Sequence, residues 1–254
     1  MEFDLSGKTA VVTGAGQGIG LAVTQALASA GADVLGGART ITPQLLAATP
    51  HAFQADLATA EGPARLIDEA LAVLGGIDIL VNNVGGAVRM AAGFLDTDDD
   101  TWKQAFELNV LSTVRTTRAA LPSLIERKGA IINIGSVNAR IADPRLAPYS
   151  AVKAAIASVT KALSVEFSPM GVRVNVISPG PVRTRIWTNP VIASKAGLTP
   201  EEFLAKVPEI MGLSTGQIVD PSEIATLAVL LASGKVPSIT GADYMIDAGM
   251  MGTL

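Results

Sequence analysis

The sequence predicts an α/β fold in which helices cover both faces of one parallel sheet, the doubly wound arrangement. Three observations predict it. Hydrophobic residues make up 49% of the 254 residues but aromatic residues only 4%, which suits buried parallel strands packed against helices. Short β-branched runs alternate with longer segments of helical periodicity, as in right-handed strand–helix–strand units. A glycine-rich turn joins the first of these runs to the first helical segment.

Seven segments have the length and the β-branched content of buried strands. They are Thr9–Thr13, Asp33–Gly36, Ala52–Ala55, Ile77–Asn82, Ala130–Ile134, Arg173–Ser178 and Tyr244–Ile246. Between them, apolar residues recur with helical spacing, and five helices are expected at Ile19–Ala30, Gly62–Leu74, Asp98–Glu126, Ala147–Met170 and Pro221–Leu231. Crossover helices between successive strands predict that all seven strands lie parallel in one sheet.

The chain has no linker, charge block or internal repeat, so residues 1–254 are expected to form a single domain. The alternation of strands and helices is interrupted only between Pro181 and Thr215, where prolines and glycines separate short apolar pieces. A long irregular segment inside a compact domain usually has a function. We therefore expect residues 181–215 to form a substrate-binding loop or lid.

Charge and residue counts exclude several classes of function. The net charge of −4 leaves no clustered basic surface of the kind that binds nucleic acid or an anionic membrane. The chain has no cysteine and one histidine, His51, so disulfides, thiolate zinc sites and a cysteine nucleophile are excluded, and no metal site is expected. The acidic first residues do not look like a signal peptide, and no apolar run is long enough to span a membrane, which predicts a cytoplasmic protein.

The turn after the first strand reads Thr13-Gly14-Ala15-Gly16-Gln17-Gly18-Ile19-Gly20. Glycines lack a Cβ atom, so they permit a tight turn and a close approach of the backbone to a diphosphate at the positive N-terminal end of the helix. The motif alone does not decide between a nucleotide-binding turn and an ordinary tight turn. Its meaning depends on the residues downstream.

Tyr149 and Lys153 are four residues apart in a predicted helix, and so they share one helix face. A tyrosine with a pKa of about 10 is a poor base at neutral pH, and lowering that pKa by roughly three units takes about 4 kcal/mol of preferential phenolate stabilisation. A lysine ammonium one turn away supplies part of it, and a positively charged nicotinamide ring could supply more. The hydroxyl of Ser136, just after the fifth strand, can hydrogen-bond an oxygen on which charge develops.

The chain resembles the short-chain dehydrogenase/reductase family over essentially its whole length. The resemblance rests on motifs in the family's order and spacing, namely Thr13-Gly14…Gly18-Ile19-Gly20, Asn82-Asn83-Val84-Gly85, Asn109, Ser136, Tyr149…Lys153 and Pro179-Gly180. It implies a Rossmann-fold oxidoreductase that moves a hydride between nicotinamide and the carbon of a small-molecule carbonyl compound or secondary alcohol. It also implies a homotetramer, or alternatively a dimer, with the apolar segment from Tyr244 to Met251 at a subunit boundary.

The resemblance further implies roles for single residues. Tyr149 is the general acid or base, and Lys153 lowers its pKa and holds the nicotinamide ribose. Ser136 orients the substrate oxygen, and Asn109 helps to hold a proton-relay water. The residues implied at the cofactor, with Asp56 at the adenine and Thr184 at the nicotinamide carboxamide, are Gly14, Gln17, Gly18, Ile19, Gly20, Arg39, Thr40, Asp56, Leu57, Asn82, Val84, Gly85, Tyr149, Lys153, Pro179, Gly180, Val182 and Thr184.

The residues after the second strand favour NADP(H) as the cofactor. An enzyme that uses NAD usually places an acidic residue there, on the ribose 2′-hydroxyl. This chain has Ala38 at that position, and Arg39 follows with a planar donor group suited to a phosphate. Arg39 could also be an ordinary surface arginine, so NAD(H) remains the alternative.

Several features have competing interpretations. Asp98, Asp99 and Asp100 suggest a metal site, but an acidic helix start stabilised by the helix dipole explains them better. Asp56 is also a common turn residue, and Asn109 could simply kink a helix. In the family, the spacing of Tyr149 and Lys153 favours carbonyl chemistry over the reduction of a carbon–carbon double bond. The alternative from another functional class is a regulator that binds NADP(H) without turnover.

Overall fold

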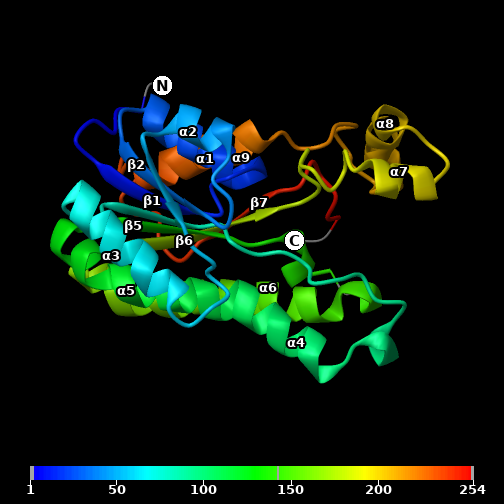
Figure 1. The fold of residues 1–254 in the computed structure, drawn as a ribbon, viewed down its shortest axis with the longest axis horizontal. Coiled ribbons are helices and arrows are strands. Elements are labelled where there is room, and N and C mark those ends of the chain that lie inside the picture. The colour runs from blue at the N-terminus through cyan, green and yellow to red at the C-terminus, as the bar shows by residue number, and fades with distance from the viewer. Residues whose placement is uncertain (1–2, 142, 253–254) are drawn as a thin grey trace.

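The computed structural model describes residues 3–141 and 143–252, and it contains the predicted seven-stranded parallel sheet (Figure 1). The strand order is β3-β2-β1-β4-β5-β6-β7. The strands are β1 (Thr9–Thr13), β2 (Asp33–Ala38), β3 (His51–Gln54), β4 (Ile79–Asn82), β5 (Ala130–Ile134), β6 (Arg173–Pro179) and β7 (Asp243–Ile246). The order reverses between β1 and β4, and in such sheets ligands bind beyond the carboxyl ends of the strands at this reversal. The doubly wound fold is confirmed.

Helices pack on both faces of the sheet because side chains alternate along each strand. One face is covered by α1 (Gly18–Ser29), α2 (Pro43–Ala48) and α9 (Pro221–Ala232) (Figure 1). The other is covered by α3 (Gly62–Leu74), α4 (Asp99–Phe106), α5 (Ser112–Arg127) and α6 (Ala147–Phe167). In β1, Ala10 and Val12 pack on the first face, whereas Val11 packs on the opposite face with Leu66 and Leu124. Within the described residues, no helix combines the length and apolar character needed to cross a membrane.

The long helix predicted over Asp98–Glu126 is not continuous. It consists of α4 and α5 joined by a π-helical turn at Glu107–Leu111. A π-helical turn inserts one extra residue, and it often marks a functional site. The turn holds Asn109, whose side chain bonds the backbone of Gly86 on the β4 side of the fold. Helical periodicity alone did not reveal the turn, because both flanking helices have the same repeat.

Residues 181–215 are not irregular, contrary to the sequence-based prediction. They contain α7 (Pro190–Lys195) and α8 (Pro200–Ile210), which lie beyond the two helical layers (Figure 1). Pro190 and Pro200 begin these helices, where the missing N–H of proline has no helical partner in any case, whereas Pro208 lies inside α8. The side chain of Thr199 accepts from Glu202 N, and Glu202 reciprocates in a capping box. The short helix α2 was also not predicted, and other element ends differ by up to three residues.

The segment has a small hydrophobic cluster of its own. Val207, Leu213 and Ile218 are buried, and the rings of Trp187 and Phe203 stack beside them with centroids 6.3 Å apart. Ala248 and Met250 of the predicted subunit-boundary segment also pack here. Ala248 and Met250 therefore pack within the same chain on the cluster that includes residues of α8.

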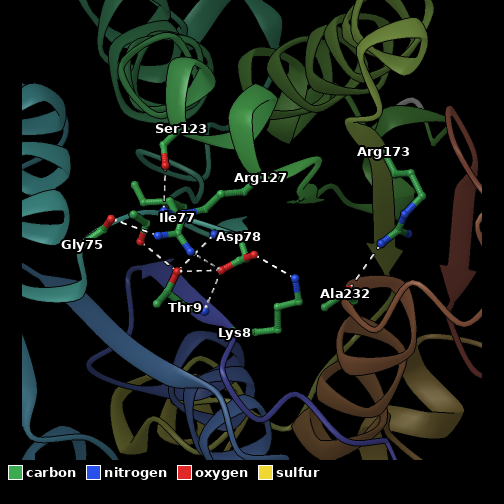
Figure 2. Close-up of polar contacts among 10 residues, drawn as sticks. Lys8, Thr9, Gly75, Ile77, Asp78, Ser123, Arg127, Arg173 and Ala232 are labelled. Carbon is green, nitrogen blue, oxygen red and sulfur yellow. Dashed lines mark hydrogen bonds and ion pairs between the residues drawn. The ribbon is translucent and has the colours of Figure 1, made fainter.

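At the amino ends of the strands, charged side chains form ion pairs and hydrogen bonds with one another (Figure 2). Asp78, with a side chain only 6% exposed, accepts from Lys8 Nζ at 2.9 Å and from Arg127 Nη1 at 3.2 Å. It also accepts from the backbone N–H and the hydroxyl of Thr9. Burial by itself raises the pKa of Asp78, but the hydrogen bonds from Lys8 and Thr9 outweigh burial and leave the pKa lowered. This network joins β1, β4 and α5.

Candidate active site

Ser136, Tyr149 and Lys153 meet where β5 ends and α6 begins. Tyr149 lies in the first turn of α6 and Lys153 one turn later, so both project from one helix face toward β5. Lys153 is 4% exposed, and its Nζ donates to the carbonyl of Ile134 at 2.9 Å. The same Nζ lies 5.7 Å from the centroid of the Tyr149 ring. The three predicted catalytic groups are therefore brought together.

The electrostatics of this group are set mainly by burial. Burial raises the pKa of Tyr149, and its hydrogen bond with the Ser136 hydroxyl partly opposes that rise. Burial lowers the pKa of Lys153 to about 8, because an ammonium loses water without gaining a carboxylate. Tyr149 is consequently a proton donor at neutral pH, which suits reduction of a carbonyl. Oxidation of an alcohol needs further positive charge near the phenol oxygen.

A neighbouring asparagine controls the Ser136 hydroxyl. The Asn138 backbone N–H donates to Ser136 Oγ at 3.1 Å, and Ser136 Oγ donates to Asn138 Oδ1 at 3.3 Å. Asn138 was not predicted at the site. Two groups of Asn138, its backbone N–H and its side-chain oxygen, thus hold the Ser136 hydroxyl in this structure.

Asn109 is tied to the backbone by all its side-chain groups. Its Oδ1 accepts from Gly86 N at 2.9 Å, and its Nδ2 donates to the carbonyls of Gly86 and Ala105 at 3.0 and 2.9 Å. A Cβ atom at Gly85 would lie 2.6 Å from Asn109 Oδ1 and 3.2 Å from Lys153 Nζ. The catalytic group and the turn after β4 thus touch at Gly85, where no side chain fits.

A cavity of about 640 Å³ extends from Gly85 across the carboxyl ends of the strands. Of the predicted cofactor residues, those that line it are Gly14, Gln17, Gly18, Ile19, Arg39, Thr40, Asp56, Leu57, Val84, Gly85 and Thr184. Gly14 and Gly18 have positive φ values of 66° and 57°, and a Cβ at Gly14 would come within 2.8 Å of Asn83 Nδ2. The turn therefore exposes backbone at the N-terminus of α1. An elongated groove with backbone N–H groups at a helix start fits a dinucleotide.

The end of the cavity near β2 carries the cofactor-selecting positions. Ala38 is the last residue of β2, and the exposed Arg39 follows it directly. Both line the cavity, so no carboxylate stands at the position where the NAD-type acid was expected. Asp56 also lines the cavity, and its carboxylate accepts from Ala58 N at 3.0 Å as a turn residue does.

The other predicted cofactor residues lie elsewhere. Asn82 is buried between strand and helix, where Nδ2 donates to Thr117 and to Asn133. The next residue, Asn83, lines the cavity and donates to the carbonyls of Thr13 and Gly14 at 2.9 and 3.2 Å. Alternation along β4 does not distinguish the two asparagines, because Leu80 on one face and Val81 on the other are both buried. Gly20 packs on Gly14 inside the turn.

Pro179, Gly180 and Val182 support the cavity without lining it. Pro179 ends β6, Gly180 donates to Ile246, and the buried Val182 bridges to Val219. Gly16 and Asn83 lie in the quoted motifs but were not named as cofactor residues, although both line the cavity. Sequence reasoning also missed lining residues outside any motif, namely Gly37, Thr42, Ala55, Leu108, Arg185 and Ile186. Arg185 was detectable as a basic residue beside the predicted Thr184.

Three acidic or basic residues considered in the sequence analysis, Asp98, Asp100 and His51, make structural contacts. Asp98 caps α4, because its Oδ1 accepts from Thr101 N at 2.8 Å. The neighbouring Asp100 pairs with Lys103 on the surface of α4. His51 Nε2 lies 3.3 Å from Asp33 Oδ1 at the far edge of the sheet. None of these residues lines the cavity.

Relatives over the full chain length carry oxidoreductase names. The oxidoreductase UcpA of Escherichia coli O157:H7 is 36% identical over 256 residues, covering 96% of this chain and 95% of that protein. A D-beta-hydroxybutyrate dehydrogenase of Rhizobium meliloti is 34% identical over 255 residues, covering 95% and 98%. The sequence similarity therefore includes both the cavity and the catalytic group.

Solved structures agree with this relationship. L-Sorbose reductase from Gluconobacter frateurii, complexed with NADPH and L-sorbose, superposes with a TM-score of 0.93 at 30% identity over 100% of both chains. Carveol dehydrogenase from Mycobacterium avium, in complex with NAD, has a TM-score of 0.89 at 25% identity over 98% and 99%. A family model described as enoyl-(acyl carrier protein) reductase matches residues 14–251. The chain belongs to the short-chain dehydrogenase/reductase family of oxidoreductases, which use a nicotinamide cofactor.

Proposed function

We propose that the protein is an NADP(H)-dependent oxidoreductase that transfers a hydride between nicotinamide and the carbon of a carbonyl compound or secondary alcohol. The observation that carries the proposal is the contact at Gly85, where the catalytic group adjoins the dinucleotide-shaped cavity. Bound NADPH supplies the hydride. The chain's own side chains donate the proton and orient the carbonyl oxygen.

The proton is given by Tyr149. Its raised pKa keeps the hydroxyl protonated at neutral pH, so Oη can donate to the oxygen of a carbonyl as that oxygen gains charge. The Ser136 hydroxyl holds the same oxygen once it is released from Asn138. Lys153, fixed on the Ile134 carbonyl, adds positive charge beside the phenol and reaches toward the nicotinamide ribose.

Asn109 is better supported as a positioning residue than as a direct holder of a relay water. Its carboxamide already makes three hydrogen bonds to the backbone of Gly86 and Ala105, and a water would have to displace one of them. We propose that Asn109 fixes the turn at Gly85 and Gly86 against the catalytic group. The π-helical turn places it there.

The choice of NADP(H) rests on Arg39. A guanidinium can meet a 2′-phosphate with paired, charge-assisted hydrogen bonds, and a carboxylate in its place would repel it. Asp56 and Leu57 would flank the adenine, Thr184 would meet the carboxamide, and Arg185 would face the diphosphate. NAD(H) is the alternative, since one structural neighbour was solved with NADPH and another with NAD.

The experiment is a cofactor-consumption assay with NADPH and with NADH on a panel of ketones, aldehydes and one unsaturated thioester. Carbonyl-dependent oxidation of NADPH is the expected result. Turnover of the thioester alone would replace the proposal with the reduction of a carbon–carbon double bond, the activity in the description of the matching family model. Cofactor binding without turnover of any compound would favour the regulator.

We also propose that residues 181–215 act as a lid. The segment borders the cavity through Thr184, Arg185 and Ile186, and its helices pack on a cluster of their own rather than on the sheet. Such a unit can close over substrate and exclude water. Amide hydrogen exchange in α7 and α8 should slow when NADP⁺ is added. Equal exchange with and without the cofactor would contradict a lid.

A homotetramer, or alternatively a dimer, is part of the proposal, as is a cytoplasmic location. Large apolar side chains exposed on α4, α6 and β7 support an assembly, namely Phe106 at 40%, Val165 at 69% and Met245 at 40%. Sedimentation velocity checks the assembly, and cell fractionation checks the location. A monomer at micromolar concentration would contradict the first.

A further inference from the structure

The loops that surround the catalytic group contain three arginines at similar distances along the chain. Arg89 follows Gly85 by four residues, Arg140 follows Ser136 by four, and Arg145 precedes Tyr149 by four. Each is a candidate for binding an anionic substrate. The structure shows what each guanidinium does instead.

Arg145 is paired within its own loop. Its Nε and Nη2 donate to the two oxygens of Asp143 at 3.1 and 2.9 Å, which is a two-point ion pair. The Asp143 carboxylate also accepts from Arg145 N. The Arg145 side chain lowers the pKa of Asp143, so the carboxylate stays ionised at neutral pH. The pair therefore has no net charge to offer a substrate.

Arg89 is bound to the start of α4. Its Nη1 donates to Asp96 Oδ2 at 2.8 Å, its Nη2 to the carbonyl of Asp96, and its Nε to Thr101 Oγ1 at 3.5 Å. All three nitrogens of the guanidinium have a partner. The arginine closes the loop from residue 89 to residue 96 rather than pointing a free donor at the cavity.

Arg140 is directed to the sheet edge. Its Nη2 donates to Asp243 Oδ2 at 2.7 Å, and Asp243 is only 16% exposed at the beginning of β7. Asp243 is paired with Val176 in the sheet, three residues before the carboxyl end of β6. This guanidinium therefore points away from the carboxyl ends of the strands, where the cavity lies.

We infer that the substrate is an uncharged carbonyl compound, and this rests on the proposed function. A carboxylate near any of these arginines would feel the attraction of the guanidinium and the repulsion of its acidic partner at similar distances, so the two largely cancel. Desolvating a carboxylate without net attraction is unfavourable. Of the other cations around the cavity, Arg39 and Arg185 line the cofactor part and Lys153 is buried on Ile134. The two side chains that would contact the reacting oxygen itself, Ser136 and Tyr149, are neutral.

The test uses a matched pair of substrates, methyl acetoacetate and acetoacetate, which share the same ketone and differ in charge. We expect kcat/KM with NADPH to be at least tenfold higher for the ester. Equal values, or a preference for the acid, would overturn the inference and leave the oxidoreductase proposal standing. No turnover of either compound or of any other matched ester and acid would overturn both.

A second set of variants tests directly whether Arg145 attracts an anionic substrate. In Asp143→Asn the amide oxygen can keep the cap on Arg145 N while the opposing charge is lost, so the ester-to-acid ratio should fall at least threefold. The double variant Asp143→Asn/Arg145→Ala removes both charges and should leave acetoacetate turnover unchanged, because the pair has no net charge. A large loss of acid turnover in the double variant would show that Arg145 binds a carboxylate. Asp100→Asn, which changes an exposed pair with Lys103 on α4, is the matched control.

Discussion

The amino and carboxyl ends of the sheet each hold a buried ionisable side chain, Asp78 at one end and Lys153 at the other, and among the described residues only Asp78 of these two has oppositely charged partners. At the amino end, Asp78 receives hydrogen bonds from Lys8, Thr9 and Arg127, and the charges neutralise one another (Figure 2). At the carboxyl end, Lys153 is equally buried, yet within the described residues its Nζ donates to a backbone carbonyl, that of Ile134, and to no carboxylate. Tyr149 beside it has a raised pKa.

The difference in partners indicates that Asp78 contributes to stability and that Lys153 belongs to a functional site. A buried carboxylate with every oxygen bonded adds stability and has no capacity left for a ligand. A buried ammonium without a carboxylate costs stability, and proteins retain such groups mainly where a ligand or a reaction uses them. The same chemistry therefore marks a structural network at one end of the strands and a candidate active site at the other. Substitutions at the two ends should have opposite consequences.

Tyr149→Phe should have the largest effect on activity. It removes the proton donor but neither the ring nor its packing, so turnover should fall by about 10²–10⁴-fold, while NADPH affinity changes only a few-fold. Steady-state rates and a fluorescence titration of NADPH measure the two quantities. Retention of more than a tenth of the wild-type rate would remove Tyr149 from its role and weaken the contrast between the two ends.

Arg39→Ala should weaken NADPH without affecting NADH. A charge-assisted bond at a partly exposed site is worth about 1.5–3 kcal/mol, which corresponds to roughly ten- to a hundredfold in affinity. The measurement is the ratio of kcat/KM for the two cofactors. Arg65→Ala, on α3 outside the cavity, is the control. A wild-type preference for NADH, or an unchanged ratio in Arg39→Ala, would disprove the cofactor assignment. Adding Ala38→Asp should invert the preference through repulsion of the phosphate.

The pH profile should follow Lys153. Because its pKa is lowered to about 8, the side chain is charged below that pH and loses its charge above it. We expect kcat/KM for NADPH to be level below about pH 8 and to fall above it, by up to tenfold per pH unit. Lys153→Met should lower the plateau and remove this break. Lys161→Met, two turns later in α6 and exposed, should leave the break in place.

Asp78→Asn should have the smallest effect on activity and a clear one on stability. Losing the charge in a network of charged hydrogen bonds should cost about 1–3 kcal/mol of unfolding free energy at pH 7. Because folding lowers the pKa of Asp78, its contribution is complete above the ordinary carboxyl pKa of about 4 and is lost as the pH falls through the lowered value. Urea unfolding at several pH values measures it, and kcat should stay within about twofold.

The variant and the wild type should approach the same stability at low pH, because protonation removes the charge from Asp78. A fall in kcat as large as that of Tyr149→Phe would mean that the two ends are coupled. Asp100→Asn, whose carboxylate is exposed on α4, should change neither the stability nor the rate and serves as the comparison for a surface carboxylate.

Much of this architecture was predictable because it depends on local pattern. The seven strands follow from short β-branched runs, the turn after β1 from its glycines, and the shared face of Tyr149 and Lys153 from helical spacing. The start of α4 followed from its acidic residues, since Asp98 caps the helix there. Each of these features is decided by residues within one or two turns of one another.

Other features depend on contacts between segments that are distant in the sequence, and the spacing of residues does not predict such contacts. The π-helical turn at Asn109 accompanies bonds to Gly86. The choice between Asn82 and Asn83 depended on which of them faces α5 and which faces the glycine-rich turn. The prolines of residues 181–215 were read as interruptions because, without neighbours, a helix start and a break look the same. The pairing of Arg140 with Asp243 joins residues 103 positions apart.

The sequence by itself determined the fold class, and it predicted the catalytic residue types and a phosphate-bearing cofactor, since these depend on periodicity and on side-chain chemistry. Only the tertiary structure decided which of these groups are charged, paired or free. Burial sets the pKa of Tyr149 and of Lys153, and the partners of Arg89 and Arg145 decide whether an anion would be attracted. Desolvation and Coulomb energies depend on distance in space, and that distance is established only when the chain has folded.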